Sequence, residues 1–158
     1  IKKLGSYNTD GSAEDAFVDG SYAYIADGDK GLVVLDISDK SNPTLKGKVD
    51  FGDAVAYAVK EKNGMAYVAA GESGVQIVDV SVPTYPTIKS VYDTEGTARD
   101  IFISGNYAYI ADGMSGVKII DISNASYPLV GSVDTDGYAM GIVVVGDYAY
   151  VADGGSGL

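Results

Sequence analysis

Short apolar runs recur along the chain at a nearly constant spacing, and none of them reaches the length of a helix. The run at residues 22–28, Tyr-Ala-Tyr-Ile-Ala-Asp-Gly, returns with small changes at 65–71, 107–113 and 148–154. The steps between the copies are 43, 42 and 41 residues. A fixed period of this length indicates an internal structural repeat.

Two further markers follow the same period. The run at 31–38, Gly-Leu-Val-Val-Leu-Asp-Ile-Ser, returns at 74–81 and 116–123. A proline follows each run in register, at Pro43, Pro86 and Pro128. Because three independent markers share one period, the repeat unit is about 42 residues long.

Each repeat is predicted to form four short strands separated by turns. The Tyr-Ala-Tyr run is the second strand and the Val/Ile/Leu-rich run is the third, since aromatic and β-branched residues favour strands. The fourth strand follows the proline, as at 44–50. The first strands lie at about 15–18, 57–60, 100–103 and 141–144. Gly- and Asp-rich connections such as 27–31 supply the turn residues.

Four strands in every 40–45 residues, roughly, are typical of one blade of a β-propeller. The sequence therefore predicts an all-β fold, a β-propeller with about four blades of four antiparallel strands. The whole chain, 1–158, is one propeller segment. Its predicted blades are 11–51, 52–94, 95–135 and a partial fourth blade at 136–158.

The first residues are predicted to belong to a different blade. Residues 1–10 match the segment before Asp136-Gly137 and are expected to form the last strand of a preceding blade. The predicted strands number fifteen, where four complete blades need sixteen. We therefore expect a native ring of more than four blades and no stable lone monomer. Self-association or continuation of the parent chain would complete the ring, since unpaired strand edges favour strand addition.

The third-strand run Leu32-Val-Val-Leu-Asp36 and its copies, together with the Tyr-Ala-Tyr element, resemble the motif of the LVIVD-repeat family. The resemblance covers essentially the whole chain. It implies a β-propeller from a bacterial or archaeal envelope or secreted protein, and it implies no particular activity. One copy departs from the pattern, with Ala70 where the other three have Asp. A role that needs this aspartate in every blade is therefore not expected.

The charge balance and the missing residue types narrow the function classes. Twenty-two acidic residues against 11 basic ones give a net charge of −11, so nucleic acid is not an expected partner. The absence of Cys and His excludes disulfides, thiol nucleophiles, His metal sites and a Ser-His-Asp triad. Arg99 is the only arginine, which excludes an arginine clamp of the sialidase type. The sequence contains no apolar run of about 18 residues, so no transmembrane segment is predicted.

Carboxylates remain as candidates for chemistry, and they recur in two positions. The third strands end in Asp36, Asp79 and Asp121, which are predicted to be structural because an Asp before Ser accepts turn hydrogen bonds. The Gly-rich loops hold a second set, Asp27, Asp29, Asp112 and Asp153. Each loop offers one or two carboxylates, whereas Ca²⁺ needs about six to eight oxygens. Ordinary turns are the favoured interpretation of this set, and no metal or other cofactor is expected.

The first strand of each blade is expected to line the central channel, and its residues differ from blade to blade. We align Asp15, Tyr57, Asp100 and Gly141 as equivalent positions. A ligand site can be built where a repeat varies, so the channel mouth is the candidate site. Its candidate ligand-binding residues are Glu14, Asp15, Tyr57, Arg99, Asp100 and Tyr138. A solvated channel wall with local Arg–Asp pairing is the simpler alternative.

Three hypotheses about function stay open. The leading one is a non-catalytic extracytoplasmic propeller, secreted by a prokaryote or displayed on its cell surface, that binds a protein or glycan ligand or acts as a scaffold. The second is a glycoside hydrolase or lyase at the channel mouth, with Asp15 and Asp100 as acid and base beside Arg99. That chemistry needs two carboxyl groups about 5–9.5 Å apart. The third is a structural subunit that assembles through open blade edges.

Overall fold

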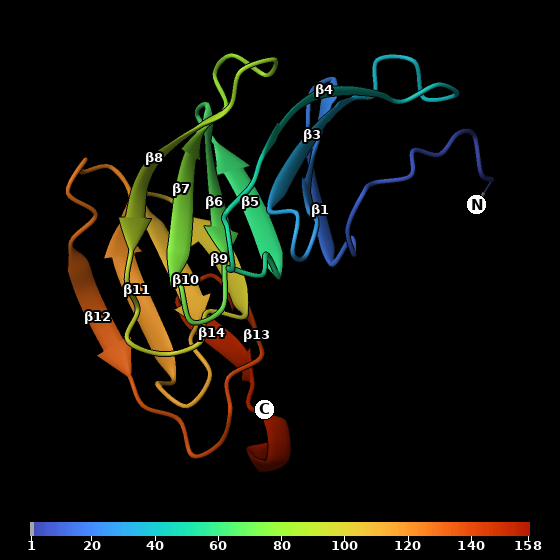
Figure 1. Cartoon of the computed structure of the whole chain (residues 1–158). Helices are drawn as coiled ribbons and strands as arrows, with labels where there is room; N and C mark the ends of the chain where they lie inside the picture. The colour runs from blue at the N-terminus through green and yellow to red at the C-terminus, as the bar shows by residue number, and fades with distance from the viewer. Residues whose placement is uncertain (1) are drawn as a thin grey trace.

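The computed structural model describes residues 2–158, in which fourteen β-strands form four antiparallel sheets (Figure 1). The first sheet contains β1 (Asp15–Asp19), β2 (Tyr22–Ala26), β3 (Leu32–Asp36) and β4 (Thr44–Val49). The second contains β5 (Ala58–Lys62), β6 (Met65–Ala69), β7 (Val75–Asp79) and β8 (Thr87–Tyr92). The third contains β9 (Asp100–Ser104), β10 (Tyr107–Ala111), β11 (Val117–Asp121) and β12 (Leu129–Val133). The fourth contains β13 (Gly141–Val145) and β14 (Tyr148–Ala152), followed by a 3₁₀ turn at Gly154–Ser156.

The strands of each sheet are adjacent in the order of the sequence, which is the up-and-down order of a propeller blade. Consecutive first strands lie against one another, β1 against β5, β5 against β9 and β9 against β13 (Figure 1). Residues 2–158 therefore form four blades of an all-β propeller, of which the last has two strands, as the repeat period predicts. Within residues 2–158, no helix has the length and apolar character needed to cross a membrane.

The hydrophobic core lies between the blades. One cluster joins the first and second blades through residues such as Leu32, Val34 and Val68. Another joins the second and third blades through Ile77 and Ile110. These side chains are fully buried. Burial of each one stabilises the fold by roughly 1.5–3 kcal/mol, so blade stacking is the main stabilising contact.

Glycines permit the tight return between the second and third strands. Gly31 has φ of 75°, and a Cβ there would collide with the carbonyl oxygen of Val49 on β4. The equivalent Gly74 and Gly116 have φ of 68° and 67° and lie equally close to a carbonyl. A side chain at these positions would be strained by backbone conformation and blocked by contact.

The predicted strand at 1–10 is not formed. Ile1 lies outside the described residues, and residues 2–14 contain no strand. A fourth strand pairs with the third strand of its own blade, as β4 pairs with β3. The last blade has only β13 and β14, so the N-terminal segment has no third strand to pair with and the strands number fourteen.

The predicted alignment of the first strands is wrong in the second blade. Ala58, and not Tyr57, is equivalent to Asp15 and Asp100, because Ala58 pairs with Ala69 as Asp15 pairs with Ala26. The connection before β5 is one residue longer than the connections before β9 and β13. That extra residue shifted the alignment by one position.

Candidate functional site

The connections from β2 to β3 and from β4 to β5, with their equivalents, lie at one end of the sheets, because adjacent strands are antiparallel. We call this end the loop end. Backbone bridges join neighbouring blades there, between Gly28 and Ala56, between Gly71 and Ala98, and between Gly113 and Ala139. The Gly71 N–H donates to the Ala98 oxygen at 3.0 Å, and the Ala98 N–H donates back at 3.0 Å. The loops are thus held in defined positions relative to each other.

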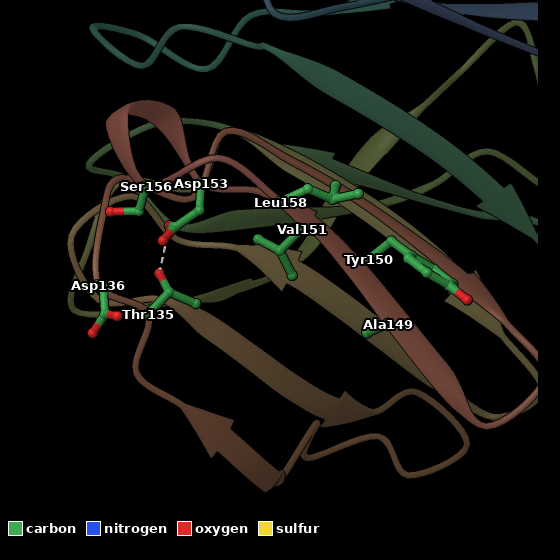
Figure 2. A pocket seen from close by; sticks show the side chains of 8 residues that line it. All are labelled: Thr135, Asp136, Ala149, Tyr150, Val151, Asp153, Ser156 and Leu158. Atoms are coloured by element: carbon green, nitrogen blue, oxygen red, sulfur yellow. Dashed lines mark hydrogen bonds between the residues drawn. The ribbon is translucent and has the colours of Figure 1, made fainter.

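Three of the four loop aspartates are buried parts of this framework. The hydroxyl groups of three threonines donate to them at 2.5–2.6 Å, in the pairs Thr9–Asp27, Thr94–Asp112 and Thr135–Asp153. Figure 2 shows the Thr135–Asp153 pair. The second oxygens of Asp27 and Asp153 accept the N–H groups of Gly11 and Gly137 at 3.0 and 2.8 Å. Each of these two carboxylates therefore ties the segment before a first strand to the end of the second strand.

The fourth loop aspartate, Asp29, is exposed and forms an ion pair with Lys30 at 3.0 Å. Within residues 2–158, no three Asp or Glu side chains are grouped in a way that could hold a metal ion. The loop aspartates have the hydrogen bonds of structural turn residues.

The aspartates at the ends of the third strands accept hydrogen bonds from the serine two residues later, as expected for structural residues. The Ser81 N–H and hydroxyl donate to Asp79 at 3.0 and 2.6 Å. Asp121 has the same partners in Ser123. Asp36 accepts the Ser38 N–H at 2.8 Å. Hydrogen bonding from Ser38 and the Lys46 ammonium at 3.1 Å lower the pKa of Asp36 to about 2.

The two carboxylates proposed as acid and base hold backbone groups between blades. Asp15 accepts the Val59 N–H at 3.0 Å and the Lys60 ammonium at 2.8 Å. Asp100 accepts the Ile142 N–H at 2.8 Å. Burial raises the pKa of Asp15, but the hydrogen bonds from Lys60 and Val59 outweigh it, so the pKa lies below its usual value. Asp15 joins the first blade to the second, and Asp100 joins the third to the fourth.

The structure brings three other candidates together at the loop end. The Arg99 guanidinium lies over the Tyr57 ring, 4.3 Å from its centroid, and is 5.8 Å from the centroid of Tyr138. Such cation–π contacts contribute roughly 0.5–2 kcal/mol each. The remaining candidate, Glu14, is exposed and accepts a hydrogen bond from Ser12 at 2.7 Å. The aromatic stack of Tyr57, Arg99 and Tyr138 therefore joins residues from the second, third and fourth blades.

A cavity of about 350 Å³ opens beside Tyr57. It is lined by Asp53, Ala54, Val55, Tyr57, Ala70, Glu72, Ser73 and Thr97. Its floor includes Ala70, the position at which the other three repeats have a buried aspartate. We call it the Ala70 cavity. The sequence singled out Tyr57 and Ala70 but not Asp53, Glu72, Ser73 and Thr97. Asp53, Glu72 and Thr97 do not recur in register, and Ser73 recurs as Ser115 and Ser156, which is typical of a turn residue.

A larger cavity, of about 520 Å³, lies along β14 (Figure 2). Three consecutive residues line it, Ala149, Tyr150 and Val151. Because consecutive strand residues point to opposite faces, this cavity follows the edge of β14. In the complete blades that edge of the second strand is paired with the third strand. The cavity therefore reflects the two-stranded state of the last blade.

A comparison with models of protein families identifies the family to which this chain belongs. The model of the LVIVD repeat matches residues 10–51, 52–94, 95–135 and 136–158, which together cover nearly the whole chain. The chain belongs to the LVIVD repeat family. The four matched copies of the LVIVD repeat coincide with the four blades. No curated protein matches the sequence.

Among solved structures, the LVIVD chain resembles the computationally designed Ika4 protein, with a TM-score of 0.79 and 11% identity over 99% of this chain and 94% of that one. It also resembles the designed Ika8 protein, with a TM-score of 0.72 and 12% identity over 88% of this chain and 42% of that one. A third similar structure is the glutaminyl cyclase of Myxococcus xanthus, with a TM-score of 0.65 and 13% identity, over 89% of this chain and 61% of that one. At these identities the likeness concerns the fold alone.

Proposed function

We propose that this LVIVD propeller is a non-catalytic binding or scaffolding module that takes a protein or glycan ligand at its loop end. The repeat fold supports a generic binding or scaffold role. The aromatic stack beside the Ala70 cavity is the observation that carries the proposal. There, residues that differ between the repeats form a concave surface with an aromatic side chain and unpaired polar groups, which is typical of ligand sites.

The non-catalytic character is supported by the hydrogen bonds of the candidate acid and base. Asp15 and Asp100 each hold a backbone N–H of the next blade. We therefore expect the removal of either carboxylate to lower the stability of the fold rather than to abolish a catalytic activity.

The test is a binding screen of the 158-residue chain on glycan and peptide arrays, followed by calorimetry with the ligands found. We expect Tyr57→Ala and Arg99→Gln to weaken the binding of a true ligand at least tenfold. Tyr85→Ser is the matched control, because Tyr85 is 75% exposed in the β7–β8 connection and contributes to neither the stack nor the cavity. Equal binding by all variants would show that the ligand does not use the loop end and would contradict the proposal.

We place the parent protein outside the cytoplasm of a prokaryote, either secreted or at the cell surface. The net charge of −11 and the sequence without Cys fit such a module. Immunoblots of cytoplasmic, envelope and culture-medium fractions would test this location. Recovery in the cytoplasmic fraction alone would contradict it.

A further inference from the structure

The Ala70 cavity exists because the second repeat departs from the other three at two matched places. The buried Asp of the other repeats is replaced by Ala70. In the third blade the threonine partner, Thr94, lies two residues after Tyr92, the last residue of β8. The equivalent position, two residues after Val49 at the end of β4, is occupied by Phe51. Phe51 packs into the core between the first two blades. The second blade thus lacks both members of the Thr–Asp pair, and a cavity of about 350 Å³ lies at Ala70.

The longer connection before β5 supplies one wall of this cavity. Asp53, Ala54 and Val55 line it from that connection, and Glu72 and Ser73 line it from the β6–β7 turn. Tyr57 is held in place on two sides. Its ring edge lies close to the Gly71 backbone, where a Cβ would come within 3.1 Å, and its face carries the Arg99 guanidinium. Tyr57 lines the cavity, whereas Arg99 does not.

The side-chain oxygens around the cavity have no hydrogen-bond or ion-pair partner in the part of the chain that the structure describes. Among residues 2–158, the side-chain oxygens of Asp53, Glu72, Ser73 and Thr97 form none of the side-chain hydrogen bonds or ion pairs seen elsewhere. Two carboxylates accept hydrogen bonds from hydroxyl groups, and two hydroxyls can donate or accept. Beside them lie an aromatic ring and the methyl groups of Ala54 and Ala70.

This combination matches the chemistry of a sugar ring, which has hydroxyl groups around its rim and apolar C–H groups on its faces. The volume lies near the lower limit of small-molecule sites, roughly 300–1,000 Å³, and suits one or two rings better than the flat surface of a protein. Asp53 and Glu72, in a protein of net charge −11, repel an acidic sugar.

We propose that the Ala70 cavity binds a neutral hexopyranose, as a unit of a glycan, with an apolar face of the ring against Tyr57 and its hydroxyl groups on Asp53, Glu72, Ser73 and Thr97. This inference rests on the proposed function, since it names the ligand class of the same loop end.

The experiment is an NMR titration of the ¹⁵N-labelled chain with methyl glycosides of glucose, galactose and mannose and with neutral disaccharides, and with glucuronic and galacturonic acids for comparison. We expect at least one neutral sugar to shift the amide signals of 53–57, 70–74 and 97, and the acidic sugars to bind at least tenfold more weakly. Ala70→Leu should fill the cavity and abolish the shifts. Thr97→Val, which keeps shape and removes one hydroxyl, should weaken binding about threefold or more. It tests the site even if Ala70→Leu fails to fold.

Three results would overturn the inference while leaving the proposed function intact. One is a ligand from the array screen whose binding depends on Tyr57 and Arg99 but is unchanged by Ala70→Leu and Thr97→Val. Another is binding of peptides, or of acidic sugars as strongly as neutral ones, at the loop end. The third is failure of every neutral sugar to shift the loop signals. Binding that Tyr57→Ala and Arg99→Gln leave unchanged would instead overturn the proposed function.

Discussion

At the scale of single residues, Asp112 differs from its two counterparts at the loop end. Its Oδ1 accepts the Thr94 hydroxyl at 2.5 Å, but its Oδ2 is buried and has no hydrogen-bond partner among residues 2–158. In the first and fourth blades the second oxygen of the equivalent aspartate accepts a glycine N–H. The turn in the third blade is different because Glu95 has φ of 64°. Burial raises the pKa of Asp112 to about 6, although the Thr94 hydroxyl opposes the shift.

A raised carboxylate pKa means that the folded protein binds this proton more tightly than the unfolded chain does. The contribution of Asp112 to stability is therefore greatest below the unfolded value near 4, falls as pH rises to about 6, and is constant above that. The loss is at most on the order of 2–3 kcal/mol. We expect Asp112→Asn, which carries no charge, to remove this part of the pH dependence. Urea unfolding at pH 4, 5, 6 and 7 measures it.

Asp153→Asn is the matched control for that experiment. Both oxygens of Asp153 accept hydrogen bonds, from the Thr135 hydroxyl at 2.6 Å and the Gly137 N–H at 2.8 Å, and an Asn side chain has only one acceptor oxygen and no charge. We expect this variant to be destabilised at every pH. Parallel pH profiles for the wild type and Asp112→Asn would contradict the assignment of the titration to Asp112.

At the scale of elements, the Thr–Asp pairs of the first, third and fourth blades join the segment before the first strand to the end of the second strand. Thr94→Val keeps the shape of the side chain and removes the hydroxyl, which leaves the buried Asp112 without its one donor. We expect a loss of about 1–3 kcal/mol in the free energy of unfolding. Chemical denaturation at pH 7 measures the loss.

Thr87→Val provides the comparison, because Thr87 is exposed on β8 and the same hydroxyl is removed there. A change within about 0.5 kcal/mol is expected there. Equal effects of the two substitutions would show that the hydroxyl of Thr94 is not the cause.

The elements themselves were predictable from the sequence, and the side-chain partnerships were not. The Tyr-Ala-Tyr and Val/Ile/Leu-rich runs identify β2, β3 and their copies, because strand periodicity and turn residues are local properties. The Thr9–Asp27 pair joins residues 18 positions apart and has no local signature. The alignment of Tyr57 with Asp15 was wrong for a related reason. One added residue before β5 leaves the repeat period nearly unchanged but shifts the side chains by one position, so that Ala58 is the equivalent residue.

At the scale of the whole molecule, the blade junctions are joined in different ways. Asp15 spans the first junction by accepting the Val59 N–H and the Lys60 ammonium, and Asp100 spans the third. The position equivalent to Asp15 and Asp100 in the second blade is Ala58, which lies in the apolar cluster of the middle junction. Tyr67 and Tyr127 meet edge to face in that cluster, with ring centroids 6.4 Å apart.

We expect Asp15→Ala to loosen the first junction and cost about 1 kcal/mol. The Val59 amide should exchange with deuterium at least severalfold faster, whereas the Ile142 amide, held by Asp100, should not. Because the pKa of Asp15 is lowered in the folded state, its contribution is present above the usual value of 3.8 and is lost as pH falls below it. Unchanged exchange at Val59 would contradict this role of Asp15.

The substitution of Ala70 for aspartate has a consequence for any attempt to average the repeats. A chain built from four copies of the third repeat, 95–135, would have Asp112 and Thr135 in every copy, so a Thr–Asp pair could form in each loop. It would have no residue like Ala70, and no connection before a first strand would have the extra residue found before β5. Such a uniform protein is expected to fold and to recognise nothing at that end. The second repeat, which departs from the other three at Ala70 and in the connection before β5, is therefore the repeat that supplies the proposed binding cavity.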